Sequence, residues 1–141
     1  MTHDHAQTLR ASGHEHVQAT HGSTFEVTTD DWLTPAGDCI LAIGADRAPA
    51  DFPAGFVDAC RGPQATIVAT IEAGGHRERI VGSGHPDLTF GSDRSAVCRT
   101  SDHVDDRTVM VGAERAAADL DRELVAALAD GAACEFTLAV E

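Results

Sequence analysis

The feature that most constrains the fold of this 141-residue chain is a nine-residue phrase that occurs twice. It reads GADRAPADF at residues 44–52 and GAERAAADL at residues 112–120, with six identical positions. A Ser-Gly-His segment, an apolar run and a closing apolar strand accompany both copies in the same order. Repeats of this size bury their apolar faces against each other, so we expect a single domain over residues 1–141, with internal repeats at approximately 7–72 and 78–141.

Each repeat is expected to fold as three strands, a helix and a final strand. Short apolar runs and period-two alternation predict the strands, and helical spacing of apolar side chains predicts the second helix. The expected strands cover residues 7–14, 23–29, 39–45 and 65–72, and then 78–85, 95–101, 108–113 and 135–141. The first helix is expected to start after Asp51 as its N-cap and to end before Gly62, and the second is expected over residues 114–130. A tight turn over residues 73–79 would join the repeats, and residues 1–6 are expected to fray.

Two small β-rich units favour closure into a barrel, because closure removes unpaired edge strands. The stretch LTPAGDCI resembles the Gly-Asp box of the cradle-loop barrels, a group that includes the double-psi barrels. There Gly37 can adopt a positive φ, and Asp38 can accept hydrogen bonds from backbone N–H groups in the turn. We therefore expect an α+β, β-dominated fold, duplicated as (β-β-β-α-β)×2 in a small pseudo-twofold barrel of cradle-loop or double-psi type. The alternative is an α+β sandwich with two helices on one sheet face.

The charge balance indicates a cytoplasmic protein from a halophile. Acidic residues outnumber basic residues 23 to 10, every basic residue is Arg, and the net charge is −13. Such a charge repels itself in a compact chain, and molar salt screens that repulsion. GC-rich codon bias is the alternative explanation for the absence of Lys. No apolar run approaches the ~20 residues of a membrane span, so no membrane partner is expected. Nucleic acid stays open as a partner, because acidity argues less strongly against it in a halophile.

Cysteine and histidine spacing assigns no metal or cofactor. No two cysteines form a C-x-x-C pair, and their apolar surroundings favour buried free thiols. No histidine spacing matches a helical or zinc site. His14 and His85 follow the glycine at equivalent positions of the repeats, so they are candidates for one shared groove. The alternatives are that each imidazole simply ends a strand, or that the pair shares a metal.

The densest polar stretch is RTSDHVDDRT at residues 99–108, which favours an anion site. The forked guanidinium groups of Arg99 and Arg107 can bind a carboxylate or phosphate, with hydroxyl groups beside them. In the alternative, both arginines pair locally with Asp102, Asp105 or Asp106. The stretch HGST adds His21 next to two hydroxyl groups. The full set of candidate ligand-binding residues is His14, His21, Thr24, Asp38, His85, Arg99, Ser101, Arg107 and Thr108.

Three segments carry a resemblance to a known family: SGHEHVQATHGSTFEVT, LTPAGDCILAIGADRA and RTSDHVDDRTVMVGAERAAADL. Over about residues 7–141 the chain resembles an archaeal family of small uncharacterised proteins, domain of unknown function 371. The resemblance implies an archaeal source. It brings no reaction, cofactor or partner with it.

We interpret the sequence as that of a binding module, with a small anionic ligand or a nucleotide in a groove between the two halves. One alternative is an enzyme that uses a histidine of the same groove as general acid or base. Another is a protein-interaction module of a larger assembly. No constellation of residues specifies a reaction class, which favours binding, and the sequence specifies no oligomeric state.

Overall fold

The computed structural model describes residues 5–141 and contains two four-stranded sheets. The larger sheet is antiparallel throughout and has the order β1-β8-β4-β5. Its strands are β1 Ala6–Ser12, β8 Ala133–Val140, β4 Thr66–Ala73 and β5 His76–Ser83. The smaller sheet has the order β3-β2-β6-β7, with an antiparallel centre and parallel outer pairs. Its strands are β3 Ile40–Ala42, β2 Thr24–Thr28, β6 Ser95–Arg99 and β7 Thr108–Met110.

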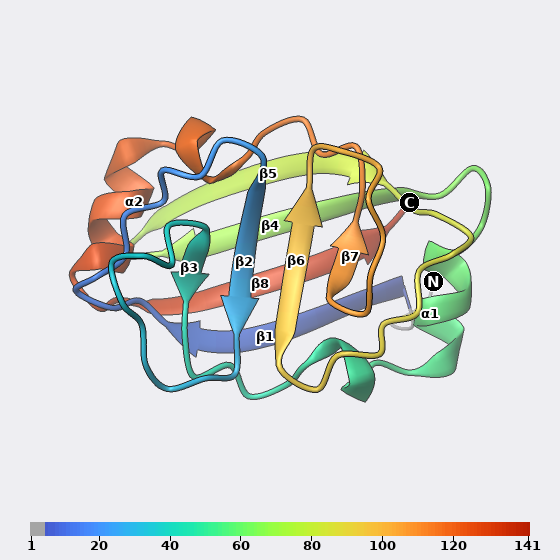
Figure 1. Cartoon of the computed structure of the whole chain (residues 1–141), viewed down its shortest axis with the longest axis horizontal. Helices are drawn as coiled ribbons and strands as arrows, with labels where there is room; N and C mark the ends of the chain where they lie inside the picture. The colour runs from blue at the N-terminus through green and yellow to red at the C-terminus, as the bar shows by residue number, and fades with distance from the viewer. Residues whose placement is uncertain (1–4) are drawn as a thin grey trace.

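The two sheets pack face to face around one apolar core, with the smaller sheet in front in Figure 1. Phe25 of β2 meets Phe136 of β8 edge to face, with ring centroids 6.4 Å apart. Alternation explains this packing, because Phe25 and Val27 of β2 point inward while Glu26 between them points outward. The expected β-dominated α+β class is confirmed.

The expected closed barrel is wrong. In residues 5–141 the edges of the two sheets are joined by isolated bridges, Ser12 with Ile43 and Ser83 with Val111, and by single backbone hydrogen bonds beside them. One residue pair at each side leaves the rest of the edges outside any ladder, so the described residues form two sheets and no closed barrel. A double-psi arrangement is likewise not confirmed.

The two helices lie at opposite ends of the molecule, and not together on one sheet face as the sandwich alternative had it (Figure 1). Helix α1, Ala54–Cys60, contacts β8, while helix α2, Arg122–Ala129, contacts β5, β4 and β3. Neither helix matches its predicted start. Asp51 ends a 3₁₀ turn, η2 Pro49–Asp51, and α1 begins only after Pro53.

The predicted helix over residues 114–130 is also too long at its start. A separate 3₁₀ turn, η3 Ala117–Asp119, comes first, and the Asp119 carboxylate accepts a hydrogen bond from the Ala116 N–H at 2.9 Å. The backbone is then extended at Leu120, and Asp121 caps α2 by accepting from the Glu123 N–H at 2.8 Å. The apolar side chains that predicted this helix are all buried, but only Leu124 and Leu128 lie on α2, whereas Ala116, Ala117 and Leu120 lie in the segment before it.

The order strand, strand, strand, 3₁₀ turn, helix, strand occurs twice along the chain. The segment following the first strand of each half packs against the helix of the other half. The Gly13 N–H donates to Ala132 and the His14 N–H to Leu128 at the end of α2, while the His85 N–H donates to Cys60 at the end of α1. Both sheets also combine strands from both halves, so neither half holds a complete sheet.

The predicted tight turn between the halves is present as a two-residue turn. Gly74 and Gly75 have φ values of 58° and 82°, a conformation that side chains with a Cβ rarely adopt. At the other end of the chain β1 already starts at Ala6, inside the segment expected to fray, and residues 1–4 lie outside the described part. Within residues 5–141, neither helix has the length and apolar character needed to cross a membrane.

Candidate functional site

The smaller sheet carries a pocket of about 260 Å³ on its outer face, which we call the β2–β6 pocket. Segments far apart in the sequence line it, and four of the residues proposed from sequence are among them: His21, Thr24, Arg99 and Arg107. The full lining is His21, Ser23, Thr24, Glu26, Cys39, Val97, Arg99 and Arg107.

Arg99 is the fixed cation of this pocket. Its side chain is only 12% exposed, its Nε donates to the Thr108 hydroxyl at 2.8 Å, and its Nη2 donates to Asp105 at 3.0 Å. Arg107 is more exposed, with 52% of its side chain accessible, and its Nη2 donates to the same carboxylate at 3.3 Å. The local pairing considered from the sequence is therefore present, through Asp105. Within residues 5–141, Nη1 of Arg99 and both Nε and Nη1 of Arg107 have no acceptor.

Asp105 is the carboxylate that pairs with both arginines, and it is itself ionised. Burial alone would raise the pKa of Asp105, but hydrogen bonds from the Thr108 hydroxyl and the Arg107 N–H, together with the Arg99 charge, outweigh it. The pKa of Asp105 is thus held well below its usual range. Two arginines and one carboxylate leave this cluster with a net positive charge in a strongly acidic chain.

His21 is oriented by the start of β2. Its Nδ1 accepts from the backbone N–H groups of Ser23 and Thr24, both at 3.2 Å, and lies 3.2 Å from the Thr24 hydroxyl. Because Nδ1 acts as the acceptor, the neutral ring carries its proton on Nε2. The ring therefore offers one N–H donor to a ligand, and its basic nitrogen is already occupied.

Glu26 and Cys39 form the opposite side of the pocket. Cys39 Sγ donates to Glu26 Oε1 at 3.5 Å. Burial, followed by the charge and hydrogen bond of Glu26, raises the pKa of Cys39 to about 11, so its thiol stays protonated and is a poor nucleophile near neutral pH. Glu26 is not among the residues predicted from sequence, although the alternation of β2 already indicates its outward position between Phe25 and Val27.

His14 and His85 do not share a groove. Their N–H groups bond to the ends of α2 and α1 at 2.9 and 3.2 Å, and these helices occupy opposite ends of the molecule (Figure 1). Each Nδ1 accepts a backbone N–H two residues further on, at 3.0 Å. The imidazoles therefore stabilise the turns that follow β1 and β5. No group of three or more His, Cys, Asp or Glu side chains in residues 5–141 has the arrangement of a metal site.

The remaining candidates surround the pocket without lining it. The Asp38 carbonyl accepts the N–H groups of Thr20 and His21 at 3.0 and 3.2 Å, which holds the entrance to β2. Thr108 is fully buried and anchors Arg99 from behind. Ser101 is exposed, and its hydroxyl accepts the His103 N–H at 3.3 Å.

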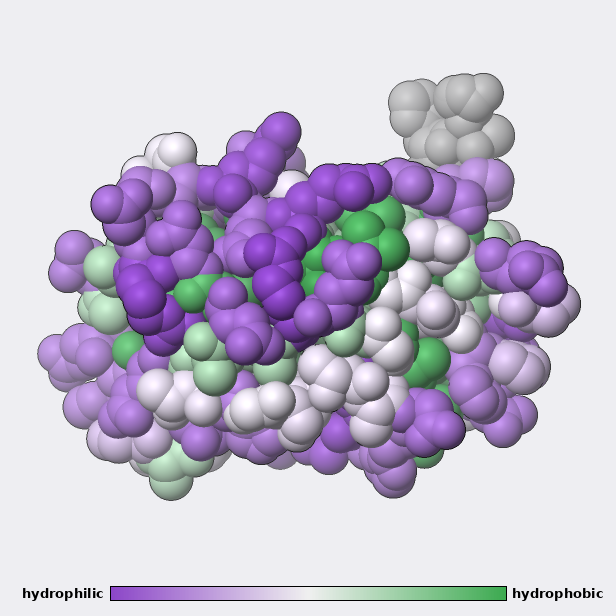
Figure 2. Space-filling view, turned by 90° about the horizontal axis from the view of Figure 1, so that it is seen from above, coloured by the Kyte–Doolittle hydropathy of each residue, from purple (hydrophilic) through white to green (hydrophobic). Residues whose placement is uncertain are grey.

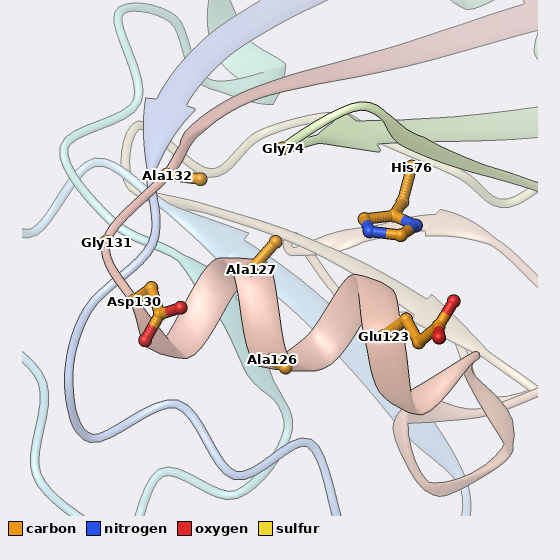
Figure 3. Close-up of a pocket in the computed structure, with 8 residues that line it drawn as sticks. All are labelled: Gly74, His76, Glu123, Ala126, Ala127, Asp130, Gly131 and Ala132. Carbon is orange, nitrogen blue, oxygen red and sulfur yellow. The ribbon is translucent and has the colours of Figure 1, made fainter.

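A second depression, of about 560 Å³, lies between α2 and the β4–β5 turn (Figure 3). His76 from β5 and Glu123 from α2 face its opening, while Ala126 and Ala127 form much of its wall. None of the residues proposed from sequence lies in it. It offers no arginine and no buried polar group, so it is the weaker candidate.

Large hydrophobic side chains are rare on the surface of residues 5–141, which argues against a large apolar docking surface. On the face seen in Figure 2, hydrophobic side chains appear as small separate areas between hydrophilic ones. Trp32, which is 61% exposed, is the one large hydrophobic side chain classed as exposed in residues 5–141. Single exposed side chains of this kind are common and mark no interface by themselves.

Comparison with known proteins supports the resemblance seen in the sequence. Residues 9–141 match the family model described as "Domain of unknown function (DUF371)". The "Uncharacterized protein MJ0206" of the archaeon Methanocaldococcus jannaschii is 39% identical over 132 residues, which cover 94% of this chain and 97% of that protein. The predicted family is thus confirmed over nearly the whole length of both proteins, and this chain belongs to the DUF371 family.

Proposed function

We propose that this chain binds a small anionic ligand in the β2–β6 pocket. The observation that carries the proposal is the placement of Arg99, a guanidinium only 12% exposed and fixed by two side chains, in the wall of a pocket. A buried arginine held in advance loses little conformational freedom when it binds an anion. Arg107 and His21 supply further donors to the same space.

Arg99 and Arg107 can bind an anion even though both pair with Asp105, because each guanidinium keeps N–H donors that have no acceptor in residues 5–141. A guanidinium carries five N–H donors, and Asp105 uses only one from each side chain. Hydrogen bonds to charged groups contribute about 1.5–3 kcal/mol each, so two or three of them suffice for a weak to moderate complex. Asp105 then acts as the support that keeps both guanidinium groups in position.

The size of the pocket favours a small ligand over a nucleotide. Its volume of about 260 Å³ lies below the ~300–1,000 Å³ that is typical of sites for drug-sized molecules. A neighbouring depression of about 600 Å³ shares Arg107, but Asp93, Asp105 and Asp106 line it. Those carboxylates would repel the phosphates of a nucleotide that extended into it.

The chemistry of the pocket favours binding over acid or base catalysis. The basic nitrogen of His21 already accepts two backbone N–H groups, so it is poorly placed to take a proton from a substrate. Cys39 is held as a thiol. A general base needs an accessible lone pair within hydrogen-bond reach of the proton that it removes.

We also infer that the chain arose by duplication of one unit and folds as a single domain. The repeated element order and the reciprocal packing of each half on the helix of the other support this. The net charge of −13 supports adaptation to high salt. The four unpaired cysteines support a reducing compartment such as the cytoplasm.

The test is a titration of the protein with acetate and with phosphate at constant ionic strength, followed by calorimetry and by ¹H–¹⁵N spectra. We expect shifts at the amides of Thr24, Val97 and Arg99, and at least tenfold weaker binding for Arg107→Gln. Arg94→Gln is the matched control, because Arg94 is 67% exposed, pairs with Asp30 at 3.3 Å and lies outside the pocket. Absence of binding to the wild-type chain, or equal losses in both variants, would refute the proposal.

A further inference from the structure

One polar group of the β2–β6 pocket has no role in anion binding. Glu26 lines the same pocket as Arg99 and Arg107, yet no ion pair joins it to either arginine. Resting on the proposed function, we propose that the ligand is a small zwitterion, whose anionic end meets the arginines and whose ammonium end meets Glu26. Glu26 would then be the residue that determines specificity for the cationic end.

The state of Glu26 is the first argument. It is half-buried, its single side-chain hydrogen bond comes from the Cys39 thiol at 3.5 Å, and its Oε2 accepts none from residues 5–141. Glu72 and Glu141, by contrast, pair with arginines at 3.0 and 3.2 Å. A partly desolvated carboxylate without a counterion is costly, and an ammonium group of a ligand would offset that cost.

The second argument is the separation of opposite charges across the sheet. Strand order places Cys39 and Glu26 on the β3–β2 side, and Arg99 and Arg107 on the β6–β7 side. Neighbouring strands lie about 4.8 Å apart, so Arg107, just before β7, is about 10 Å from β2 across β6. Arg99 is one strand away from Glu26, on β6, where it pairs with Thr24 while Glu26 pairs with Val97. Asp105 engages both arginines and so keeps them from collapsing onto Glu26. The pocket therefore has a negative and a positive side that stay apart.

The third argument is the charge sum of the pocket. Arg99 and Arg107 contribute two positive charges, and Asp105 and Glu26 contribute two negative ones. A simple anion would be attracted by the two arginines and repelled by the carboxylate of Glu26. A zwitterion adds no net charge and satisfies both sides, which makes it the better complement of a site with this sum.

The experiment compares acetate, methylamine and three ω-amino acids of increasing length, namely glycine, β-alanine and 4-aminobutyrate. Each is titrated into the wild-type chain under identical salt. We expect at least one amino acid to bind tenfold or more tightly than acetate, and methylamine to bind weakest of all. The preferred length measures the separation between the two charged sides. This comparison needs no variant, so it does not depend on a mutant that folds.

Variants then assign the cationic end to Glu26. We expect Glu26→Gln to bind the preferred amino acid at least tenfold more weakly and to leave acetate binding unchanged or stronger, whereas Glu114→Gln, an exposed control, changes neither. If wild type binds acetate and Arg107→Gln removes that binding, but no amino acid binds better than acetate, the zwitterion inference is refuted and the anion site stands. If neither acetate nor any amino acid binds, both proposals fall.

Discussion

The front half of the molecule, residues 6–73, and the back half, residues 76–140, share a framework but not a surface chemistry. Their backbone contacts correspond closely. The bridge between Ser12 and Ile43 has its counterpart between Ser83 and Val111. The N–H of Ala48 bonds to the carboxylate that ends η2 at 2.8 Å, and the N–H of Ala116 does the same in η3 at 2.9 Å. These repeated contacts hold, in each half, the segment that leads from the third strand through the 3₁₀ turn to the helix.

The halves differ on the outer face of the smaller sheet. The Glu26 N–H donates to the Cys39 carbonyl at 2.9 Å, and the Val97 N–H donates to the Arg107 carbonyl at 2.8 Å, so these two pairs occupy equivalent places. An acid in one half thus corresponds to an apolar residue in the other, and a thiol corresponds to an arginine. The contacts that the two halves share therefore hold the fold, while the candidate site lies where the two halves differ.

The largest loss of stability is expected for substitutions of Gly13 and Gly84, the glycines at which each half packs on the helix of the other half. A Cβ at Gly84 would lie 2.0 Å from the Cys60 carbonyl oxygen, and one at Gly13 would lie 1.9 Å from that of Leu128. Because a backbone carbonyl at a helix end cannot rotate away, we expect each Gly→Ala change to lower the free energy of unfolding by about 3 kcal/mol or more. Chemical denaturation at constant salt measures both values.

Gly55→Ala is the matched control, because an added Cβ there meets nothing within 4 Å and lies in α1. Its stability should change by less than about 1 kcal/mol, in the stabilising direction. The structural equivalence of the halves predicts similar losses at Gly13 and Gly84. A loss at one of these positions without a loss at the other would break the comparison.

The next largest loss of stability is expected to differ between the halves, at the equivalent residues Arg115 and Arg47. Arg115 pairs with Glu78, whose side chain is 8% exposed, whereas Arg47 donates to the neutral Gln7 at 2.6 Å. Removing Arg115 leaves a buried carboxylate without its cation, and we expect Arg115→Met to cost about 3 kcal/mol. Arg47→Met should cost about 1 kcal/mol, because the group left behind is uncharged.

A double mutant sharpens this result. Adding Glu78→Gln to Arg115→Met gives the back half the neutral side chain that the front half has at Gln7. We expect the addition to restore at least half of the lost stability, as measured in a thermodynamic cycle. An equal loss for the two single arginine variants would show that the charge of Glu78 does not distinguish the halves.

Local patterns in the sequence were sufficient for the strands but not for the way they assemble. Alternation and apolar runs located all eight strands of the described residues to within a few positions. The start of α2 was missed because the carboxylate of Asp119 closes its own turn, a tertiary corner that helical propensity over an Ala-rich stretch does not reveal. Closure into a barrel depends on how sheet edges meet, which no local pattern reports.

The same limit applies to the candidate site. Polar density drew attention to Arg99 and Arg107, and the HGST stretch to His21, and these three residues line one pocket. The proposed groove shared by His14 and His85 is not formed, because His14 lies against the end of α2 and His85 against the end of α1, at opposite ends of the molecule. Repetition in a sequence predicts similar local surroundings for two residues, but not how far apart the two residues lie in the folded chain.

The remaining effect depends on pH and concerns Asp105, whose counterpart in the front half is Gly37. The Thr108 N–H donates to the Asp105 carbonyl at 3.1 Å, as the Ile40 N–H donates to that of Gly37 at 3.2 Å, but only the back half has a carboxylate there. The pKa of Asp105 is lowered in the folded state, so its ionised form adds stability above the pKa of an unfolded Asp, near 4. That contribution is lost as the pH falls through the lower, folded pKa.

Asp105→Asn should therefore be less stable than wild type at pH 7, and the difference should shrink steadily as the pH falls from about 5 towards 2. His103→Gln is measured in parallel as a control, because His103 Nε2 lies 3.7 Å from the Asp105 carboxylate. Unfolding at a series of pH values and constant salt gives the profile. If the difference in unfolding free energy between wild type and Asp105→Asn stays constant with pH, the side chain of Asp105 stabilises the fold through packing and hydrogen bonds and not through its charge. The back half would then differ from the front half in its hydrogen bonds alone, and the positive side of the pocket would lose its electrostatic support.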